Sequence, residues 1–309
     1  MRVFVTGASG WIGSAVVPEL IGAGHQVVGL ARSDASAEAL TAAGAEVVRG
    51  SLDDLDVLRT AAADSDGVIH LAFKHDVAFS GGFQSAAEAD RRAVDVLTEA
   101  LVGSDRPFVL ASGLAGLKPG RVATEQDMPV VEGGSPILIR AVTAQAVLAS
   151  AERGVRSSVV RLSPTCHGDG DNGFMASLIG IAREKGVSGY PGEGANRWPA
   201  VHRLDAARLF RLAVEKAPAG TVLHGAAEEG VPLREIAEVI GRQLKLPTVS
   251  VGAEDLAGHF GWMSGFVGLD APASNAATRA LLDWDPTGPS LLADLEEGHY
   301  FRATEDRAV

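Results

Sequence analysis

The chain has 309 residues, with 27 Lys and Arg against 39 Asp and Glu, a formal net charge of -12 and a single cysteine. At about 150 residues per domain, this length predicts one large or two modest domains with enough chain to bury a core. The acidic balance argues against a general nucleic-acid binder, whose domains usually carry a basic stripe. The lone Cys166 excludes a disulfide framework or a cysteine zinc site and is typical of a reducing compartment.

Met1 runs directly into Arg2–Gly7, which leaves no room for the charged, apolar and cleavage regions of a signal peptide. Gly, Asp, Arg or Pro interrupts every apolar run before it reaches the roughly 18 residues that span a bilayer. We therefore expect a cytoplasmic protein that does not bind membranes.

The first half of the chain alternates short β-branched segments with longer Ala- and Leu-rich segments of helical period. The predicted strands are Val3–Thr6, Gln26–Leu30, Glu46–Arg49, Gly67–Leu71, Phe108–Ala111 and Ser157–Leu162. The predicted helices are Ile12–Ala23, Ala35–Ala43, Asp54–Ala63, Ala86–Val102 and Ile137–Arg153. This alternation indicates βαβ units, so we expect an α/β fold with a doubly wound parallel sheet.

The alternation loosens after Pro164. Residues 165–201 are rich in Gly and Pro around one predicted helix, Phe174–Lys185, which indicates loops that shape a pocket. A helix, a strand and a second helix follow at Leu204–Lys216, Val222–His224 and Pro232–Leu246. We divide the chain into a sheet domain of residues 1–164 plus 200–226 and a smaller, partly discontinuous C-terminal substrate lobe of residues 165–199 plus 227–309.

A glycine-rich turn follows the first predicted strand, and a helix begins directly after it. Its central residues are Gly7, Ser9, Gly10, Trp11, Ile12 and Gly13. Residues without Cβ let backbone N–H groups approach a pyrophosphate, which then lies on the positive end of the helix. Because the strand, the turn and the helix come in the required order, the turn predicts dinucleotide binding and a Rossmann-type sheet.

The glycine spacing is GxxGxxG, preceded by Thr6, instead of the more widespread GxGxxG. In this the sequence resembles the extended and atypical branch of the short-chain dehydrogenase/reductase superfamily, the NAD(P)-dependent epimerases, dehydratases and reductases. The resemblance is specific from Met1 to about Leu71 and looser through Trp198–Asp205. It implies an enzyme that binds NAD(P) in the sheet domain.

The residues after the second strand favour NADP over NAD. Ala31 occupies the position where an NAD enzyme usually places a carboxylate on the ribose, and Arg32 and Ser33 follow it. A guanidinium can hold a 2′-phosphate through two hydrogen bonds, and Ser33 adds a hydroxyl. The alternative is that Arg32 is a solvated loop residue and Asp34 a helix cap.

Further cofactor contacts are implied by the resemblance. Ser51 and Leu52 follow the third strand, where relatives commonly carry an Asp that contacts adenine. Leu71, Ala72 and Phe73 follow the fourth strand, in a segment that resembles the one lying along the ribose and phosphates. We also expect Pro164, after the sixth strand, to contact the cofactor.

The expected catalytic motif is only partly present. Relatives use a Ser or Thr to polarise the substrate carbonyl, together with a Tyr and a Lys four residues apart in a YxxxK motif. Ser112 stands at the expected place, but the chain contains no YxxxK, and the corresponding positions are Ile137 and Ala141. Arg140 lies one position off the Lys position, about 100° around the helix, where it could bind cofactor or substrate.

Reduction of a carbonyl still requires a proton for the developing alkoxide. Two histidines follow strands that end near the nicotinamide position, His75 after the fourth strand and His167 after the sixth. Each could supply that proton, with Asp76 orienting His75 or raising its pKa, or each could be a satisfied loop histidine. We interpret His202, in the segment that returns to the sheet domain, as structural.

These features together predict an NADP(H)-dependent oxidoreductase that acts on a carbonyl, or a C=N bond, of a small or medium organic molecule. The alternatives are a nucleotide-sugar epimerase or dehydratase, whose chemistry relies on the missing Tyr and Lys, and a non-enzymatic NADP(H) sensor. We expect no metal, because no histidines lie at metal-ligand spacing with a third partner. A homodimer through the helices Ala86–Val102 and Ile137–Arg153 is compatible with their apolar content.

Overall fold

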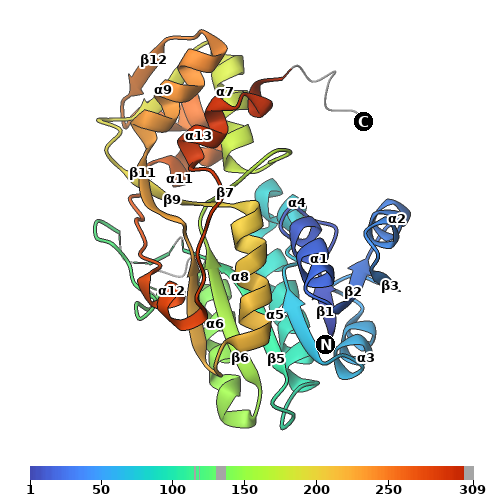
Figure 1. The fold of residues 1–309 in the computed structure, drawn as a ribbon. Coiled ribbons are helices and arrows are strands. Elements are labelled where there is room, and N and C mark those ends of the chain that lie inside the picture. The colour runs from blue at the N-terminus through green and yellow to red at the C-terminus, as the bar shows by residue number, and fades with distance from the viewer. Residues whose placement is uncertain (115, 118, 130–136, 303–309) are drawn as a thin grey trace.

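A parallel sheet of seven strands forms the centre of the computed structural model, which describes residues 1–114, 116–117, 119–129 and 137–302 (Figure 1). The strands are β1 (Arg2–Thr6), β2 (Gln26–Ala31), β3 (Glu46–Arg49), β4 (Gly67–His70), β5 (Pro107–Gly113), β6 (Arg156–Leu162) and β10 (Thr221–Gly225). Their spatial order is β3-β2-β1-β4-β5-β6-β10, and all neighbours pair in parallel. The order reverses between β1 and β4, which is where doubly wound sheets bind dinucleotides. The predicted α/β fold and its first six strands are confirmed.

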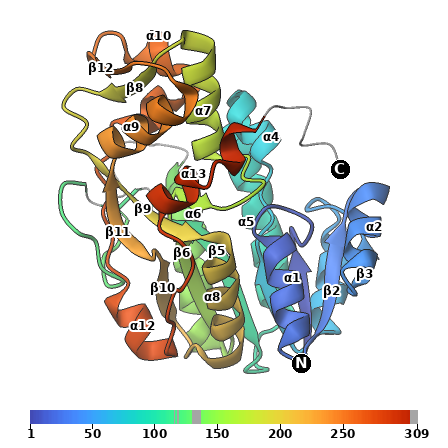
Figure 2. The same ribbon diagram turned by 45° about the horizontal axis from the view of Figure 1, so that its top comes forward.

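Helices cover both faces of this sheet (Figure 2). One face carries α1 (Gly13–Gly22), α2 (Asp34–Ala42) and α8 (Arg203–Lys216), and the other carries α3 (Leu55–Ala63), α5 (Phe83–Glu99) and α6 (Ile137–Ala149). Successive side chains of a strand point to opposite faces, so Val3 and Val5 enter the core under α1 and α8 while Phe4 enters the core under α3 and α5. Because helices bury both faces of the sheet, the strands carry apolar residues on both faces and do not alternate apolar with polar residues.

Two helices differ from their predicted bounds by more than two residues. Helix α5 begins at Phe83 instead of Ala86, after a one-turn helix α4 (His75–Val77) and a π-helical turn η1 (Ala78–Gly82). The predicted helix Ile137–Arg153 ends its α-helical part at Ala149 and closes in a 3-10 turn, η2 (Ser150–Arg153). Gly154, with φ of +73°, then stops it in the left-handed conformation that glycine adopts without steric cost.

The remaining elements form a lobe at the carboxyl edge of the sheet (Figures 1 and 2). Its strands are β7 (Thr165–His167), β9 (Arg197–His202) and β11 (Glu228–Pro232) in one sheet and β8 (Ser188–Pro191) and β12 (Thr248–Val251) in another. Its helices are α7 (Phe174–Lys185), α9 (Leu233–Leu244), α10 (Leu256–Phe260), η3 (Gly261–Met263), α11 (Ser264–Val267), α13 (Leu291–Glu296) and η4 (His299–Phe301). Trp198, Phe260 and Tyr300 are buried in the core of this lobe.

One segment beyond residue 226 packs on the sheet domain instead of in the lobe. Helix α12 (Ala276–Leu282) ends at Leu282, which lies with Trp284 in the same core as Phe210 of α8. The indole N–H of Trp284 donates to the carbonyl oxygen of Asp205 at 3.0 Å. The chain therefore returns to the sheet domain once more than the predicted division allowed. None of the helices that the structure describes is long and apolar enough to cross a membrane.

Candidate active site

The glycine-rich turn between β1 and α1 forms a cradle of backbone atoms. Gly7 has φ of +67°, and a Cβ there would lie 2.8 Å from the backbone nitrogen of Ala72. A Cβ on Gly13 would lie 2.1 Å from the carbonyl oxygen of Gly7. No side chain caps the start of α1, at Ile12. The residues present therefore fit a pyrophosphate, which would take the space and the N–H groups that side chains leave open.

Trp11 ties this turn to the lobe. Its indole N–H donates to the carbonyl oxygen of Cys166, the middle residue of β7, at 2.9 Å. The guanidinium carbon of Arg203 lies 4.1 Å from the centre of a Trp11 ring, and Arg203 also donates to Ser14 at 3.0 Å. Ser9 is exposed. The predicted cofactor residues of the turn thus lie together where sheet domain and lobe meet.

The end of β2 presents a cation to solvent. The side chain of Arg32 is 70% exposed, and its guanidinium lies 3.6 Å from the Asp76 carboxylate. Ser33, not Asp34, is the N-cap of α2, because its hydroxyl accepts from the backbone N–H of Ser36. The Asp34 carboxylate forms an ion pair with Arg49 instead. The Asp34 carboxylate is therefore paired with a neighbouring cation and does not cap α2.

Ser51 is held inside its own turn. Its backbone N–H and its hydroxyl both donate to the Asp54 carboxylate, at 2.7 and 2.8 Å, and its oxygen accepts from the N–H of Asp53. Leu52 is buried. An adenine contact at this point would therefore come through backbone atoms more readily than through the Ser51 hydroxyl.

A pocket of about 180 Å³ opens between the carboxyl edge of the sheet and the lobe. It brings Ser112 and His75 together with Phe73, three of the predicted site residues. The described residues that line it are Phe73, His75, Phe83, Ser112, Gly113, Gly116, Pro129, Arg140, Ala141, Ala144, Gln145, Leu148, Val159, Arg161, Phe174 and Phe266. Leu71, Ala72 and Pro164 are half-buried at the ends of the neighbouring strands and are not among the lining residues.

Ser112 is the residue that brings a hydroxyl group to this pocket, and the other described lining residues carry none. It lies near the end of β5, in register with Arg161 of β6. It makes no hydrogen bond to any residue that the structure describes, so its hydroxyl is not consumed by local backbone. Ala141, at the position of the lysine in related sequences, also lines the pocket, while the side chain of Ile137 lies outside the described part of the chain.

A buried polar chain leads from the glycine-rich turn to Arg140. Thr6 is hydrogen-bonded to Nδ1 of His70 at 2.8 Å, and Nε2 of His70 donates to Asp90 at 3.1 Å. The second carboxylate oxygen of Asp90 lies 3.9 Å from Nε of Arg140. Arg140 donates to the carbonyl oxygen of Ala111 at 3.1 Å.

Of the residues in this buried polar network, only Arg140 was identified from the sequence as a possible binding residue. A signal existed, because Asp90 lies four residues after Ala86 and four before Val94, on the buried stripe of an amphipathic helix. An acidic residue in such a stripe requires a buried partner.

The neighbours of His75 keep it neutral. Burial and the Arg140 guanidinium lower the pKa of His75 below its usual 6.5, against the opposing charges of Asp76 and Asp90. The expectation that Asp76 would raise this pKa is therefore outweighed, and Asp76 itself pairs with Arg32. Phe73 packs edge-on against the imidazole, with ring centres 5.1 Å apart, and the Arg140 guanidinium carbon lies 4.1 Å from the centre of the same Phe73 ring.

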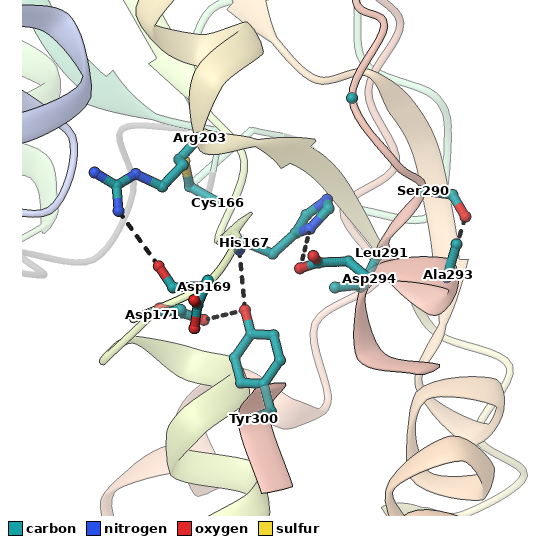
Figure 3. Close-up of polar contacts among 12 residues, drawn as sticks. Cys166, His167, Asp169, Asp171, Arg203, Ser290, Leu291, Ala293, Asp294 and Tyr300 are labelled. Atoms are coloured by element: carbon teal, nitrogen blue, oxygen red, sulfur yellow. Dashed lines mark hydrogen bonds and ion pairs between the residues drawn. The ribbon is translucent and has the colours of Figure 1, made fainter. Parts of the chain in front are cut away.

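His167 does not line this pocket. It is 1% exposed, and its Nδ1 lies 2.9 Å from the Asp294 carboxylate of α13 (Figure 3). The other oxygen of Asp294 accepts from Nε2 of His299. Tyr300 donates to Asp171 at 2.9 Å and accepts from the N–H of Gly168 (Figure 3). We name these five side chains, His167, Asp171, Asp294, His299 and Tyr300, the junction cluster. The predicted proton-donor role of His167 finds no support in this placement, since its partner is a buried carboxylate and not a pocket.

The junction cluster also fixes the protonation state of Tyr300, whose hydroxyl bonds to Asp171 and Gly168. Burial and the nearby Asp171 raise the pKa of Tyr300 far above its usual value, so this hydroxyl stays protonated at neutral pH. Asp294, Glu297 and His299 are the one group of three potential metal ligands among the described residues, and Glu297 is exposed. His202 packs edge-on against His167, with ring centres 5.5 Å apart, in keeping with a structural role.

The fold and the turn can now be compared with known proteins. A family model described as "NAD dependent epimerase/dehydratase family" matches residues 3–224 of the chain. The chain belongs to this family. This family agrees with the resemblance drawn from Gly7, Gly10 and Gly13.

Two fungal proteins are similar over the whole length. Uncharacterized protein C2A9.02 of Schizosaccharomyces pombe is 46% identical over 97% of this chain and 100% of its own, and YLL056C of Saccharomyces cerevisiae is 46% identical over 97% and 99%. A 2′-dehydrokanamycin reductase of Streptomyces kanamyceticus is 32% identical over 82% of this chain and 70% of its own.

Solved structures share the fold at low sequence identity. A double mutant of DesIV, a dTDP-glucose 4,6-dehydratase of Streptomyces venezuelae, was solved with NAD. It has a TM-score of 0.78 at 20% identity, covering 99% of this chain and 98% of its own. A UDP-glucuronic acid 4-epimerase of Bacillus cereus, in complex with UDP-glucuronic acid and NAD, has a TM-score of 0.76 at 19% identity, covering 97% and 98%.

Proposed function

We propose that the protein is an NADP(H)-dependent oxidoreductase that reduces a carbonyl group, or a C=N bond, of a small or medium organic molecule. The observation that carries this proposal is the shared pocket of Ser112 and His75, beside a backbone cradle that fits a pyrophosphate. The wall around these groups is mostly aromatic and aliphatic, which excludes water from a reacting carbonyl and strengthens hydrogen bonds to it.

The glycine-rich turn and three residues of the pocket would each have a distinct part in the chemistry. The turn from Gly7 to Gly13 and the residues after β4 would hold the dinucleotide, which supplies a hydride when bound. Ser112 has an uncommitted hydroxyl and would donate a hydrogen bond to the substrate oxygen as negative charge develops there. His75, in its protonated form, would deliver the proton that the alkoxide needs. Arg140 keeps a positive charge in the same pocket, because a guanidinium stays protonated.

The choice of NADP rests on the end of β2. Arg32 and Ser33 follow β2, where we expect a 2′-phosphate to bind, Ala31 replaces the usual carboxylate, and Asp34 is paired with Arg49. A free carboxylate would repel the phosphate, whereas an exposed guanidinium attracts it. NAD is the less favoured cofactor.

Several relatives carry reductase names, which supports reduction over epimerisation. They include a 2-alkyl-3-oxoalkanoate reductase of Stenotrophomonas maltophilia and a quinoline-oxide ketoreductase of Stigmatella aurantiaca, at 27% and 26% identity. Ala141 cannot perform the work of the lysine on which epimerases and dehydratases rely, and the described lining residues include no tyrosine.

The test is to follow NADPH consumption by the purified protein against a panel of ketones, aldehydes, imines and nucleotide sugars. We expect oxidation of NADPH with at least one carbonyl or imine, and product reduced at that bond. Tight NADPH binding without turnover of any member would instead support a non-enzymatic sensor, and interconversion of a nucleotide sugar without net NADPH loss would support an epimerase.

A further inference from the structure

Arg161 is a buried guanidinium without a counter-ion. Its residue is 4% exposed and it lines the pocket, yet it forms no ion pair with any residue that the structure describes. Its hydrogen-bond partners are neutral: one nitrogen, Nη1, donates to the carbonyl oxygen of Asp127 at 2.8 Å and lies 3.4 Å from Nε2 of His224. Buried charges in proteins are normally paired, because an isolated one loses its hydration without compensation.

The nearest carboxylates are committed elsewhere. Asp127 forms an ion pair with Arg121 and accepts from the N–H and hydroxyl of Thr124, which together hold its pKa well below the usual range. Glu125 accepts from both the N–H and the hydroxyl of Thr278. Neither carboxylate therefore forms an ion pair with Arg161, and both lower the electrostatic potential at its guanidinium only from a longer distance.

His224 orients the guanidinium without neutralising it. Its Nδ1 lies 2.8 Å from the carbonyl oxygen of Ser274, a geometry that makes this nitrogen the N–H donor of a neutral ring. Burial lowers the pKa of His224, so the ring stays neutral at pH 7. Its Nε2 lone pair is then left to accept from Arg161, whose Nη2 and Nε have no partner among the described residues.

A second cation faces the same pocket. Arg140 has one carboxylate in reach, Asp90 at 3.9 Å, and His70 shares that carboxylate. The described lining residues contain both arginines and no Asp or Glu, in a chain whose net charge is -12. The pocket is thus a cationic site inside an acidic protein, a setting that concentrates anions.

We propose that Arg140 and Arg161 form an anion subsite and that the substrate is an oxo acid, a carbonyl compound that carries an acidic group. This inference rests on the proposed function, since it names the substrate of the same pocket. Ser112 and Arg161 are paired across β5 and β6, so their side chains leave the same face of the sheet. The acidic group therefore lies close to the carbonyl that Ser112 contacts. Phe83, Phe174 and Phe266 bind the apolar remainder.

A carboxylate is the form of the anion that fits best. A guanidinium presents parallel N–H groups that match the two oxygens of a carboxylate, and the two arginines meet in a pocket of about 180 Å³. A phosphate monoester offers the same recognition chemistry from a different source. The experiment separates the two.

The test measures binding and requires no turnover. The full-length protein, saturated with NADP⁺, is titrated calorimetrically with 3-phenylpropanoate, with the neutral 3-phenylpropanamide of similar shape, and with 2-phenylethyl phosphate. We expect the carboxylate to bind at least about 10-fold more tightly than the amide, as a charge-assisted pair predicts. Equal binding of carboxylate and amide overturns the proposal without any variant.

The variants assign the effect to residues. Arg161→Gln should remove the preference for the carboxylate, Arg161→Lys should restore part of it, and Arg140→Gln should reduce it by a smaller factor. Arg91→Gln removes an equal charge from the exposed face of α5, where Arg91 pairs with Asp95, and should change nothing. If Arg161→Gln fails to fold, Arg140→Gln decides, because its side chain is 24% exposed and less critical for packing.

The outcomes distinguish this inference from the proposed function. Tightest binding of the phosphate, with the same dependence on Arg161, supports the anion subsite and assigns a phosphorylated substrate. A carboxylate preference that survives both arginine substitutions contradicts the subsite. Absence of NADPH turnover with a preserved carboxylate preference would contradict the proposed reductase and leave the subsite standing.

Discussion

Two clusters of polar side chains lie near the carboxyl edge of the sheet, and they are built in opposite ways. In the pocket, Ser112 has no hydrogen bond to the described chain and Arg161 has no counter-ion. In the junction cluster both carboxylates are satisfied: Asp294 accepts from His167 and His299, and Asp171 accepts from Tyr300 and the N–H of Gly173. Figure 3 shows the contacts of His167 with Asp294 and of Tyr300 with Asp171. Nε2 of His167 is the buried side-chain atom of this cluster that has no partner among the described residues. Buried carboxylates with all their partners hold a structure together, whereas polar groups that line a pocket and have no partner indicate where a ligand binds.

The comparison predicts that the junction cluster contributes to stability and the pocket to turnover. Asp294→Ala leaves two buried imidazoles without their shared partner and should lower the free energy of unfolding by about 3 kcal/mol. Urea denaturation measures this change. Turnover per folded molecule should stay within about 3-fold, because the cluster does not line the pocket. Asp95→Ala, at an exposed ion pair, is the control and should cost less than about 0.5 kcal/mol. Lost turnover at unchanged stability would place the reacting groups at the junction instead.

Ser112→Ala tests the pocket side of the comparison. Removal of a hydrogen bond made mainly in the transition state should lower kcat by about 100-fold. The affinity for NADPH, measured by fluorescence titration, should not change. Ser177→Ala is a suitable control, since that hydroxyl donates to the carbonyl oxygen of Gly173. Unchanged turnover in Ser112→Ala would remove Ser112 from the mechanism.

The pH dependence of the reduction should report His75. Its pKa is lowered, so the imidazolium that donates a proton is the minor form at pH 7 and becomes the major form only as the pH falls through the lowered pKa. The reduction rate should therefore rise by about 10-fold for each unit of acidification in that window and then level off. His75→Asn should flatten the profile. A wild-type rate that falls on acidification, with the protein still folded, would rule out His75 as the donor.

The smallest effect is expected at the cofactor's adenosine end. Arg32→Ala should weaken NADPH binding by about 10-fold, the loss of one charge-assisted contact, and leave NADH binding within about 2-fold. Arg59→Ala removes another exposed arginine, paired with Asp56, and should affect neither. Equal losses for both cofactors in Arg32→Ala would overturn the NADP preference.

Local signals in the sequence were sufficient for the sheet domain. The strands alternate with helices at short range, and the turn at Gly7, Gly10 and Gly13 is contiguous, so spacing alone identified the fold and the family. Cofactor contacts at Arg32, Ser51 and Pro164 stay predictions, because no comparison or contact tests them.

The pocket required contacts between distant segments. Asp90 meets His70 and Arg140 across separations of 20 and 50 residues, and Arg161 meets His224 across 63. His75 and His167 looked equivalent in the sequence, since each follows a strand that ends at the same edge. Only the position of α13 shows that Asp294 takes His167 into the junction cluster. The position of Trp284 on the sheet domain likewise depends on tertiary packing and left no local signal.

The most direct test of the central claim is a crystal structure with NADP⁺ and a non-reacting carbonyl compound bound. Our account predicts a carbonyl oxygen within hydrogen-bond distance of Ser112 Oγ and facing His75, with His167 still paired to Asp294. A carbonyl oxygen held by His167, with Ser112 out of reach, would contradict it.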